Sequence, residues 1–309
     1  MRLLEDRVVV VTGAGRGIGR DHALALARYG AKVLVNDLGG ELDGRGSSSS
    51  PADEVVAEIR EAGGEALANY DDVTDFEASA NLIRQAIDTW GKLDVLVNNA
   101  GILRDRISWN MTEEDWDLVM NVHMKGTFCC TRHALVHWRL LFKRDGQLQN
   151  ARIINTVSGA MFGNVGQSNY GAAKAGIMGY TIGVALEAQQ MGVTANAIRP
   201  GGQTRMSNAV PDDSALGARR KDRSERDTDL PDTFGSELVC YLASMHSGWI
   251  SGQMLRVGEN ALEIDEGWQV AGMLPAPDGK QWTAEQLIAG LPKLVGTAPG
   301  SLVEFLDAQ

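Results

Sequence analysis

The sequence is poor in cysteine, in basic charge and in long apolar runs, and each shortage excludes a class of protein. Its 309 residues contain three cysteines, too few for a disulfide framework and without metal-site spacing, so we expect core thiols in a reducing compartment. A net charge of −11 argues against a nucleic-acid partner, which would require a basic face. No apolar run reaches the length of a membrane span, and the first strand pattern begins too early for a signal peptide. These shortages predict a cytoplasmic protein with no nucleic-acid, membrane or metal partner.

Strand and helix patterns alternate along the chain, which predicts an α/β protein. Hydrophobic residues make up 44% and charged residues 22%, as in a globular domain, and the length suits one α/β domain with a large core. Short apolar runs predict strands at residues 8–12, 32–37, 65–70, 95–97, 152–156, 194–198 and 253–257. Helical patterns between them require right-handed crossovers and place ligands at the carboxyl ends of the strands. We expect a doubly wound, seven-stranded parallel sheet.

A glycine-rich turn follows the first predicted strand directly. The sequence Gly13-Ala14-Gly15-Arg16-Gly17-Ile18-Gly19 leads from that strand into a helical pattern that continues to Tyr29. Glycines let the backbone approach a pyrophosphate, and the free N–H groups of a helix start point at it. The alternative is an ordinary glycine-rich connection between a strand and a helix. The turn therefore predicts a dinucleotide site whose contacts are Gly13, Arg16, Gly17, Ile18 and Gly19.

A carboxylate, Asp37, ends the second predicted strand. It lies eighteen residues beyond Gly19, where a dinucleotide fold places the group that accepts hydrogen bonds from the adenosine ribose hydroxyls. The same charge would repel a 2′-phosphate, which favours NAD over NADP. Arg16 is the opposing feature, because a cation inside the glycine turn could attract that phosphate. We expect the charge of Asp37 to prevail and NAD to be the cofactor.

Tyr170 and Lys174 are four residues apart in a helical pattern that follows the fifth predicted strand. At this spacing two side chains share one face of a helix, so the lysine ammonium can lie close to the tyrosine phenol. A nearby cation lowers the pKa of a tyrosine and brings proton transfer within reach at neutral pH. A chance pair on a surface helix has the same spacing, but Ser158 adds a hydroxyl just after the preceding strand. This pattern predicts an acid–base site made of Tyr170, Lys174 and Ser158.

Further candidate residues follow the other predicted strands. Asn121 lies in the middle of one long predicted helix over residues 112–142 without a packing reason, so we assign it to the site, whereas we interpret His123 as an incidental helix residue. A polar stretch at residues 207–232 is interpreted as a mobile segment over the site or as a solvated loop. Because strand ends bind the ligand in such a sheet, the remaining predicted cofactor contacts are Asp72, Val73, Asn99, Ala100, Gly101, Pro200, Gly201 and Thr204.

These motifs, in this order, resemble those of the short-chain dehydrogenase/reductase family over about residues 5–258. A closer similarity rests on residues 35–40, 98–106 and 163–174. It is to the (3R)-hydroxyacyl-CoA dehydrogenase part of peroxisomal multifunctional enzymes and to its bacterial relatives, a branch that includes hydroxysteroid dehydrogenases. The resemblance implies a Rossmann-type fold, a homodimer or homotetramer, and a catalytic tetrad of Asn121, Ser158, Tyr170 and Lys174.

The resemblance also implies a task for each member of the tetrad. Tyr170 would exchange a proton with the substrate oxygen, and Lys174 would lower the pKa of that tyrosine and hold the nicotinamide ribose. Ser158 would hydrogen-bond the substrate oxygen, and Asn121 would hold a water that relays a proton from Lys174. The expected reaction is hydride transfer between NAD and a secondary alcohol or ketone of lipid metabolism, either a 3-hydroxyacyl-CoA or a hydroxysteroid.

The two substrate classes make different demands on the cleft. A 3-hydroxyacyl-CoA requires cations for its phosphates, for which Arg104, Arg106 or the cluster at residues 219–223 could serve, although a charge run is usually a solvated face. A steroid requires only an apolar trough. We place the 3-hydroxyacyl-CoA first and the hydroxysteroid second.

The sequence departs from the family pattern at two places. Ser158 precedes Tyr170 by twelve residues where the family usually has thirteen, and an alignment without a gap puts Val157, which has no hydroxyl, in the serine's place. A one-residue deletion in the following loop would keep Ser158 in position, with Thr156 as the nearby rival. Arg199 and Gln203 also differ from the usual loop after the sixth strand, which bears on the substrate more than on the chemistry.

The family likeness ends near residue 258, and the predicted catalytic domain ends with it. We expect residues 1–258 to form a dinucleotide-binding and catalytic domain, and residues 259–309 a C-terminal extension packed on the same domain or on a neighbouring subunit. A second function is also compatible with the fold, that of a catalytically silent NAD-binding sensor or scaffold protein. Such a protein would be expected to have a broken tetrad, whereas all four residue types are present here.

Overall fold

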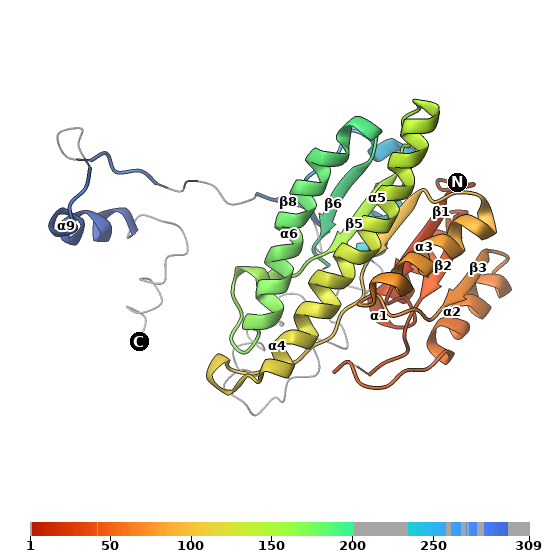
Figure 1. Cartoon of the computed structure of the whole chain (residues 1–309), viewed down its shortest axis with the longest axis horizontal. Coiled ribbons are helices and arrows are strands. Elements are labelled where there is room, and N and C mark those ends of the chain that lie inside the picture. The colour runs from red at the N-terminus through yellow and green to blue at the C-terminus, as the bar shows by residue number, and fades with distance from the viewer. Residues whose placement is uncertain are drawn as a thin grey trace. The chain divides into compact units, whose positions relative to one another are not determined.

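The structure, a computed structural model, describes residues 2–41, 43–200, 234–257, 261–266, 270, 272–276 and 281–295. The chain divides into two units, Met1–Asp265 and Glu266–Gln309. The first unit contains one sheet with helices on both of its faces (Figure 1), and the second contains helix α9, Ala284–Val295. No helix in the described part of the chain is long and apolar enough to cross a membrane.

The sheet of the first unit has eight strands in the order β3-β2-β1-β4-β5-β6-β7-β8. Strands β1 to β7 run parallel to one another, which confirms the predicted doubly wound parallel sheet, although the sheet has eight strands instead of the predicted seven. Strand β8 was not predicted and pairs antiparallel with β7. The bounds are β1 Val8–Thr12, β2 Lys32–Asn36, β3 Glu65–Asn69, β4 Val95–Asn98, β5 Arg152–Thr156, β6 Thr194–Ile198, β7 Met254–Val257 and β8 Leu262–Asp265.

Helices follow the strands as the alternating pattern predicts. Their bounds are α1 Gly17–Arg28, α2 Ser50–Glu61, α3 Phe76–Trp90, α4 Glu113–Met120, α5 Gly126–Asp145, α6 Ser168–Ala188 and α8 Phe234–Ala243. Short 3₁₀ turns are η1 Ser108–Asn110, η3 Gly159–Phe162, η4 Gln189–Met191 and η5 Met245–Ser247.

The single long helix predicted over residues 112–142 is wrong in one respect, because it is interrupted. Between α4 and α5 lies a π-helical turn, η2 Asn121–Lys125, in which the N–H of Gly126 donates to the carbonyl of Asn121 five residues earlier. A π turn inserts a residue into the helix and often marks a functional site. Hydrophobic periodicity does not reveal such an insertion, since the apolar face continues through it.

Alternation along the strands gives the sheet two separate apolar layers. On β1, Val9 and Val11 pack with α1, α2 and α8, while Val8 and Val10 pack with α3, α5 and α6. Both faces of the sheet are thus covered, as Figure 1 shows for the side formed by α3, α5 and α6. This is why β1 is apolar at every position from Val8 to Val11.

A chain of buried amides links the strand ends to helix α6. The Asn98 Nδ2 donates to Asn155 Oδ1 across 2.9 Å, joining the ends of β4 and β5. The Asn155 Nδ2 donates in turn to Thr181 Oγ1 on α6, across 2.8 Å. Because buried polar groups are costly to leave unpaired, this chain fixes α6 against the carboxyl edge of the sheet.

All three cysteines are buried and unpaired. Burial raises the pKa of each of these thiols, Cys129, Cys130 and Cys240. They are core residues, as the sequence predicts.

Candidate active site

Helix α6 brings Tyr170 and Lys174 together beside the end of β5. The Lys174 Nζ lies 5.5 Å from the centroid of the Tyr170 ring and donates a 2.7 Å hydrogen bond to the carbonyl of Thr156. Lys174 is buried, and burial lowers its pKa to about 7. A lysine side chain with this pKa can gain or lose a proton near neutral pH, which suits a proton-transfer site.

Ser158 lies at the turn between β5 and α6, which it caps. Its Oγ accepts a 3.3 Å hydrogen bond from the N–H of Ala160 and so begins the turn η3. Helix α6 packs closely on this turn, since a Cβ added to Gly171 would lie 2.6 Å from the Ala160 carbonyl oxygen. Gly171, next to Tyr170 in the chain, therefore lets the tyrosine's helix approach the serine's turn.

The two rivals of Ser158 have other surroundings. Val157 is buried in an apolar cluster with Ile177 and Met178, as expected of a core side chain. Thr156 is buried, and its Oγ1 has no hydrogen-bond partner among the described residues. We therefore keep Ser158 as the predicted serine of the site.

The glycine-rich turn has the backbone that a close ligand requires. Gly13 and Gly17 have φ angles of 61° and 53°, in the left-handed region that favours glycine. A Cβ added to Gly17 would meet nothing within 4 Å, so this side of the turn is open. Helix α1 begins without a side-chain cap and without an acidic residue in its first turn. The open turn and the uncapped helix start fit the pyrophosphate of a dinucleotide.

Asp37 lies against the same turn. Its Oδ2 accepts from the N–H of Gly15 and its Oδ1 from the N–H of Gly39, each across 2.7 Å. A carboxylate has about four lone-pair sites, so it keeps capacity to accept from ribose hydroxyls. Arg16 is half-buried, and its guanidinium donates to the carbonyl of Gly40 across 3.3 Å.

The loop after β4 supports the glycine turn. The Asn99 amide donates to the carbonyls of Thr12 and Gly13, across 3.2 and 3.0 Å. The Thr12 Oγ1 accepts from the backbone N–H groups of Asn99 and Ala100, across 3.0 and 3.1 Å. The side chain of Asn99 thus holds the turn in shape, and Thr12 is a supporting residue that sequence reasoning missed.

The other predicted cofactor contacts lie at the same edge or outside the described residues. Ile18 is the second residue of α1, and a Cβ added to Gly19 would lie 2.1 Å from the Gly13 carbonyl oxygen. Asp72 accepts from the N–H of Thr74 across 2.8 Å, while Val73 is buried. Pro200 is half-buried after β6. Gly201, Thr204, Gln203 and residues 207–232, with the cluster at 219–223, lie outside the described residues.

Asn121, the fourth member of the predicted tetrad, is exposed in the π turn, whereas His123, two residues on, is buried. The His123 ring lies edge-on to the ring of Tyr170, with centroids 5.1 Å apart and planes at 81°. Burial, and secondarily the charge of Lys174, lowers the pKa of His123 to about 3, so the ring is neutral at ordinary pH. Sequence reasoning assigned this histidine no role.

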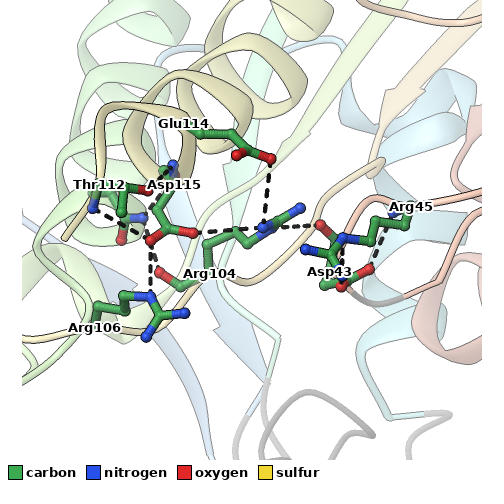
Figure 2. Close-up of polar contacts among 8 residues, drawn as sticks. Asp43, Arg45, Arg104, Arg106, Thr112, Glu114 and Asp115 are labelled. Atoms are coloured by element: carbon green, nitrogen blue, oxygen red, sulfur yellow. Dashed lines mark hydrogen bonds and ion pairs between the residues drawn. The ribbon is translucent and has the colours of Figure 1, made fainter.

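Arg104 and Arg106 are engaged by a buried carboxylate (Figure 2). Asp115, in the first turn of α4, lies 3.5 Å from Arg104 Nη1 and 2.8 Å from Arg106 Nε. Hydrogen bonds from Thr112 and from Arg106 hold the pKa of Asp115 below its usual value, although burial opposes them. The Arg104 Nε also donates to the Asp43 carbonyl across 2.6 Å. Arg104 is almost fully covered, whereas the Arg106 side chain is 57% exposed and retains N–H groups for an anion.

Within the described residues, no three or more His, Cys, Asp or Glu side chains come close enough together to hold a metal ion.

Among the proteins that are similar in sequence are a mouse and a mycobacterial enzyme. The family described as short chain dehydrogenase matches residues 7–215. The peroxisomal multifunctional enzyme type 2 of Mus musculus is 48% identical over 211 residues, which are 68% of this chain and 27% of that enzyme. The chain thus spans about a quarter of the length of the mouse protein. A Mycobacterium tuberculosis protein named hydroxyacyl-CoA dehydrogenase ChsB1 is 38% identical over 297 residues, covering 93% of this chain and 88% of that protein.

Solved structures with the same fold include two short chain dehydrogenases. A short chain dehydrogenase from Mycobacterium avium has a TM-score of 0.81 and 41% identity, and the match covers 97% of this chain and 98% of that one. A short chain dehydrogenase from Burkholderia cenocepacia J2315 in complex with NADP has a TM-score of 0.70 and 30% identity, covering 84% and 100%. The likeness to the first structure extends over nearly the whole of both chains.

Proposed function

Because the chain belongs to the short-chain dehydrogenase family, we propose that it transfers a hydride between NAD and the secondary alcohol of a 3-hydroxyacyl-CoA, or its ketone. The observation that carries this proposal is the pair of Tyr170 and Lys174 at the carboxyl edge of the sheet, with the Ser158 turn packed on their helix. The nicotinamide, when bound, supplies the hydride chemistry.

The chain's own residues would manage the proton and the substrate oxygen. Tyr170 exchanges a proton with that oxygen, and the ammonium of Lys174 stabilises the phenolate that remains. Ser158 donates a hydrogen bond to the same oxygen. The lysine's bond to the Thr156 carbonyl fixes the ammonium under the tyrosine ring, which keeps the electrostatic support in place during turnover.

Similarity to named relatives supports a 3-hydroxyacyl-CoA as the first candidate substrate class. The relative that covers 93% of this chain is named a hydroxyacyl-CoA dehydrogenase, and the mouse relative is a peroxisomal multifunctional enzyme. Arg106 supports an acyl-CoA, since its exposed guanidinium has N–H groups beyond the one that bonds Asp115. A hydroxysteroid is the second candidate class.

NAD is proposed over NADP because of Asp37. Its carboxylate is held at the glycine turn by two backbone N–H groups, so a 2′-phosphate bound there would meet a fixed negative charge. Arg16 is the cation that could offset this charge, and one similar structure holds NADP. We expect the charge of Asp37 to outweigh that of Arg16.

A substrate screen with matched variants tests the function. NAD reduction is followed over 3-hydroxyacyl-CoAs, hydroxysteroids and simple secondary alcohols. Tyr170→Phe is expected to lower kcat by about 10²- to 10⁴-fold, and Ser158→Ala by about 10²-fold or more, each with little change in cofactor Kd. Tyr180→Phe, the same substitution farther along α6, is the control and should keep kcat close to that of the wild type.

Four results would contradict parts of this proposal. Near-normal turnover in Tyr170→Phe removes the tyrosine from its role, and near-normal turnover in Ser158→Ala does the same for the serine. Turnover of steroids beside failure of every acyl-CoA reverses the order of the substrate classes. Cofactor binding without turnover over the whole panel supports the alternative of a catalytically silent NAD-binding protein.

We also propose a homodimer or homotetramer in the cytoplasm. Exposed apolar side chains on α5 and α6, among them Leu140 and Leu186, support association of subunits. Three buried, unpaired cysteines are consistent with a reducing compartment.

A further inference from the structure

We propose that His123 is a further positioning residue of the site, which fixes the loop after β4 against the ring of Tyr170. The proposal rests on the oxidoreductase function proposed above. Its basis is the placement of the His123 side chain in the helical segment that contains the π turn.

Two rows of residues, each spaced by four, lie along this segment and have opposite exposure. Asp117, Asn121 and Lys125 form an exposed row. Asp115, Val119 and His123 form a buried row. Residues four apart lie close to one face of a helix, so His123 continues the buried row towards Tyr170. The structure turns His123 inward.

His123 is bonded to the backbone just beyond the predicted cofactor contacts Asn99, Ala100 and Gly101. Its Nε2 lies 3.1 Å from the N–H nitrogen of Ile102 and 2.9 Å from the carbonyl oxygen of the same residue. The neutral ring carries one proton, so Nε2 either donates to the carbonyl or accepts from the N–H. In both tautomers the ring is tied to Ile102.

The ring has room because Gly101 has no side chain. A Cβ added to Gly101 would lie 2.4 Å from His123 Cε1 and 3.1 Å from Nδ1. The imidazole therefore packs directly on the backbone of the loop on one side and meets the edge of the Tyr170 ring on the other. A movement of the loop is transmitted to the tyrosine through one rigid ring.

A second polar atom of the ring is buried in the site. His123 Nδ1 is inaccessible to solvent and has no hydrogen-bond partner among the described residues. The titratable groups that face the ring are Tyr170 and Lys174. A neutral imidazole beside both of them adds a hydrogen-bonding atom without adding a charge that would compete with the ammonium.

Kinetics of His123 variants are the first test. His123→Phe keeps the ring but removes both nitrogens, and is expected to lower kcat about tenfold or more, with KM and cofactor Kd within about twofold. His123→Gln places an amide near the position of Nε2 and should recover most of that loss. Lys125→Ala, on the exposed row of the same π turn, is the control and should leave kcat unchanged.

A spectroscopic measurement tests the placement without turnover. In protein labelled with ¹⁵N-histidine, the His123 signal is assigned as the one lost in His123→Phe. It is expected to remain that of a neutral ring through pH 6 and to shift in Tyr170→Phe. This readout also serves if His123→Phe does not fold, since His123→Gln can then supply the assignment.

The proposal is overturned if His123→Phe keeps kcat within about threefold of the wild type, or if Asn121→Ala loses kcat while His123→Phe does not. It is also overturned if the His123 signal titrates near the ordinary histidine pKa of about 6.5 or ignores the tyrosine substitution. If the wild type turns over nothing in the substrate screen, the proposed function fails, and the ¹⁵N signal alone then decides whether His123 is placed against Tyr170.

Discussion

At the scale of single residues, Asp37 is held in one orientation before any ligand arrives. Both of its oxygens accept backbone hydrogen bonds, from Gly15 and from Gly39. A carboxylate held by two hydrogen bonds does not readily turn away from a bound 2′-phosphate. Its charge is therefore expected to repel that phosphate and to favour NAD over NADP. The neighbouring Arg16 guanidinium donates to the Gly40 carbonyl across 3.3 Å and provides an opposing charge.

Removal of this charge is predicted to shift the cofactor preference. Asp37→Asn should raise kcat/KM for NADP relative to NAD by about tenfold, because a like-charge repulsion of about 1 kcal/mol or more at a partly exposed site is lost. Steady-state kinetics with both cofactors measure the ratio. Glu41→Gln removes an exposed charge from the same loop and should leave the ratio unchanged. A wild-type enzyme that already prefers NADP would show that Arg16 prevails.

The residues of the site were predictable where a fixed spacing determines the geometry. Tyr170 and Lys174 meet because residues four apart share a helix face, and Asp37 follows a buried strand directly. The burial of His123 against Tyr170 was not predicted, because a lone histidine in a helical pattern does not show which side it faces. The available signal was its spacing of four from the buried Val119, while Asn121 is spaced by four from the exposed Asp117. Thr12 and Gly171 were missed because their roles depend on contacts between distant segments.

At the scale of secondary structure elements, one buried histidine joins helix α1 to helix α8. His22 on α1 is fully buried, and its Nδ1 lies 2.8 Å from Ser236 Oγ on α8. Burial lowers the pKa of His22 to about 3. The folded protein therefore keeps this ring neutral at pH values where the unfolded chain, with an ordinary histidine pKa of about 6.5, takes up a proton.

This difference predicts a loss of stability in mild acid. The contribution of neutral His22 is fully present above about pH 6.5 and is lost as the pH falls towards 3, at up to about 1.4 kcal/mol per pH unit. Between pH 7 and pH 5 the wild type should lose about 2 kcal/mol more unfolding free energy than His22→Gln, measured by chemical denaturation. His246→Gln, at an exposed position, should follow the wild type. Equal losses in wild type and His22→Gln would show that His22 is protonated in the folded state.

The elements themselves were largely predictable because the sheet is parallel and covered on both faces. Strands such as Val8–Thr12 must then be apolar throughout, which is visible in the sequence. Strand β8 was missed because it has only four residues, with Leu262 and Ile264 exposed, so it has no buried face to mark it. Arg199, which departs from the family pattern, forms ion pairs with Asp265 and Glu263 of β8. These ion pairs join the end of β6 to β8.

At the scale of the whole molecule, helices α5 and α6 present apolar side chains to solvent. Phe128 and Tyr180 meet between the two helices with ring centroids 6.4 Å apart. Leu140 on α5 is 61% exposed and Leu186 on α6 is 72% exposed. Apolar side chains gathered on one face of a protein commonly mark a subunit interface.

Introduction of a charge at Leu186 is predicted to dissociate the proposed oligomer. Leu186→Arg should shift the sedimentation coefficient towards that of a monomer, because a charge buried in an apolar interface is not compensated. Analytical ultracentrifugation compares it with the wild type at one concentration. Trp249→Arg changes an apolar side chain that is 79% exposed on another segment and should leave the sedimentation unchanged. A wild type that sediments as a monomer would contradict the proposed oligomer.

The burial of all three thiols makes the chain suited to site-selective labelling. Alkylating reagents attack accessible thiolates, and Cys129, Cys130 and Cys240 are neither accessible nor readily ionised. A cysteine introduced on the surface, for example by Lys125→Cys, would then carry a fluorophore without prior removal of the native cysteines. Because the native cysteines are buried, a single fluorophore attached at the π turn can report on this part of the helix.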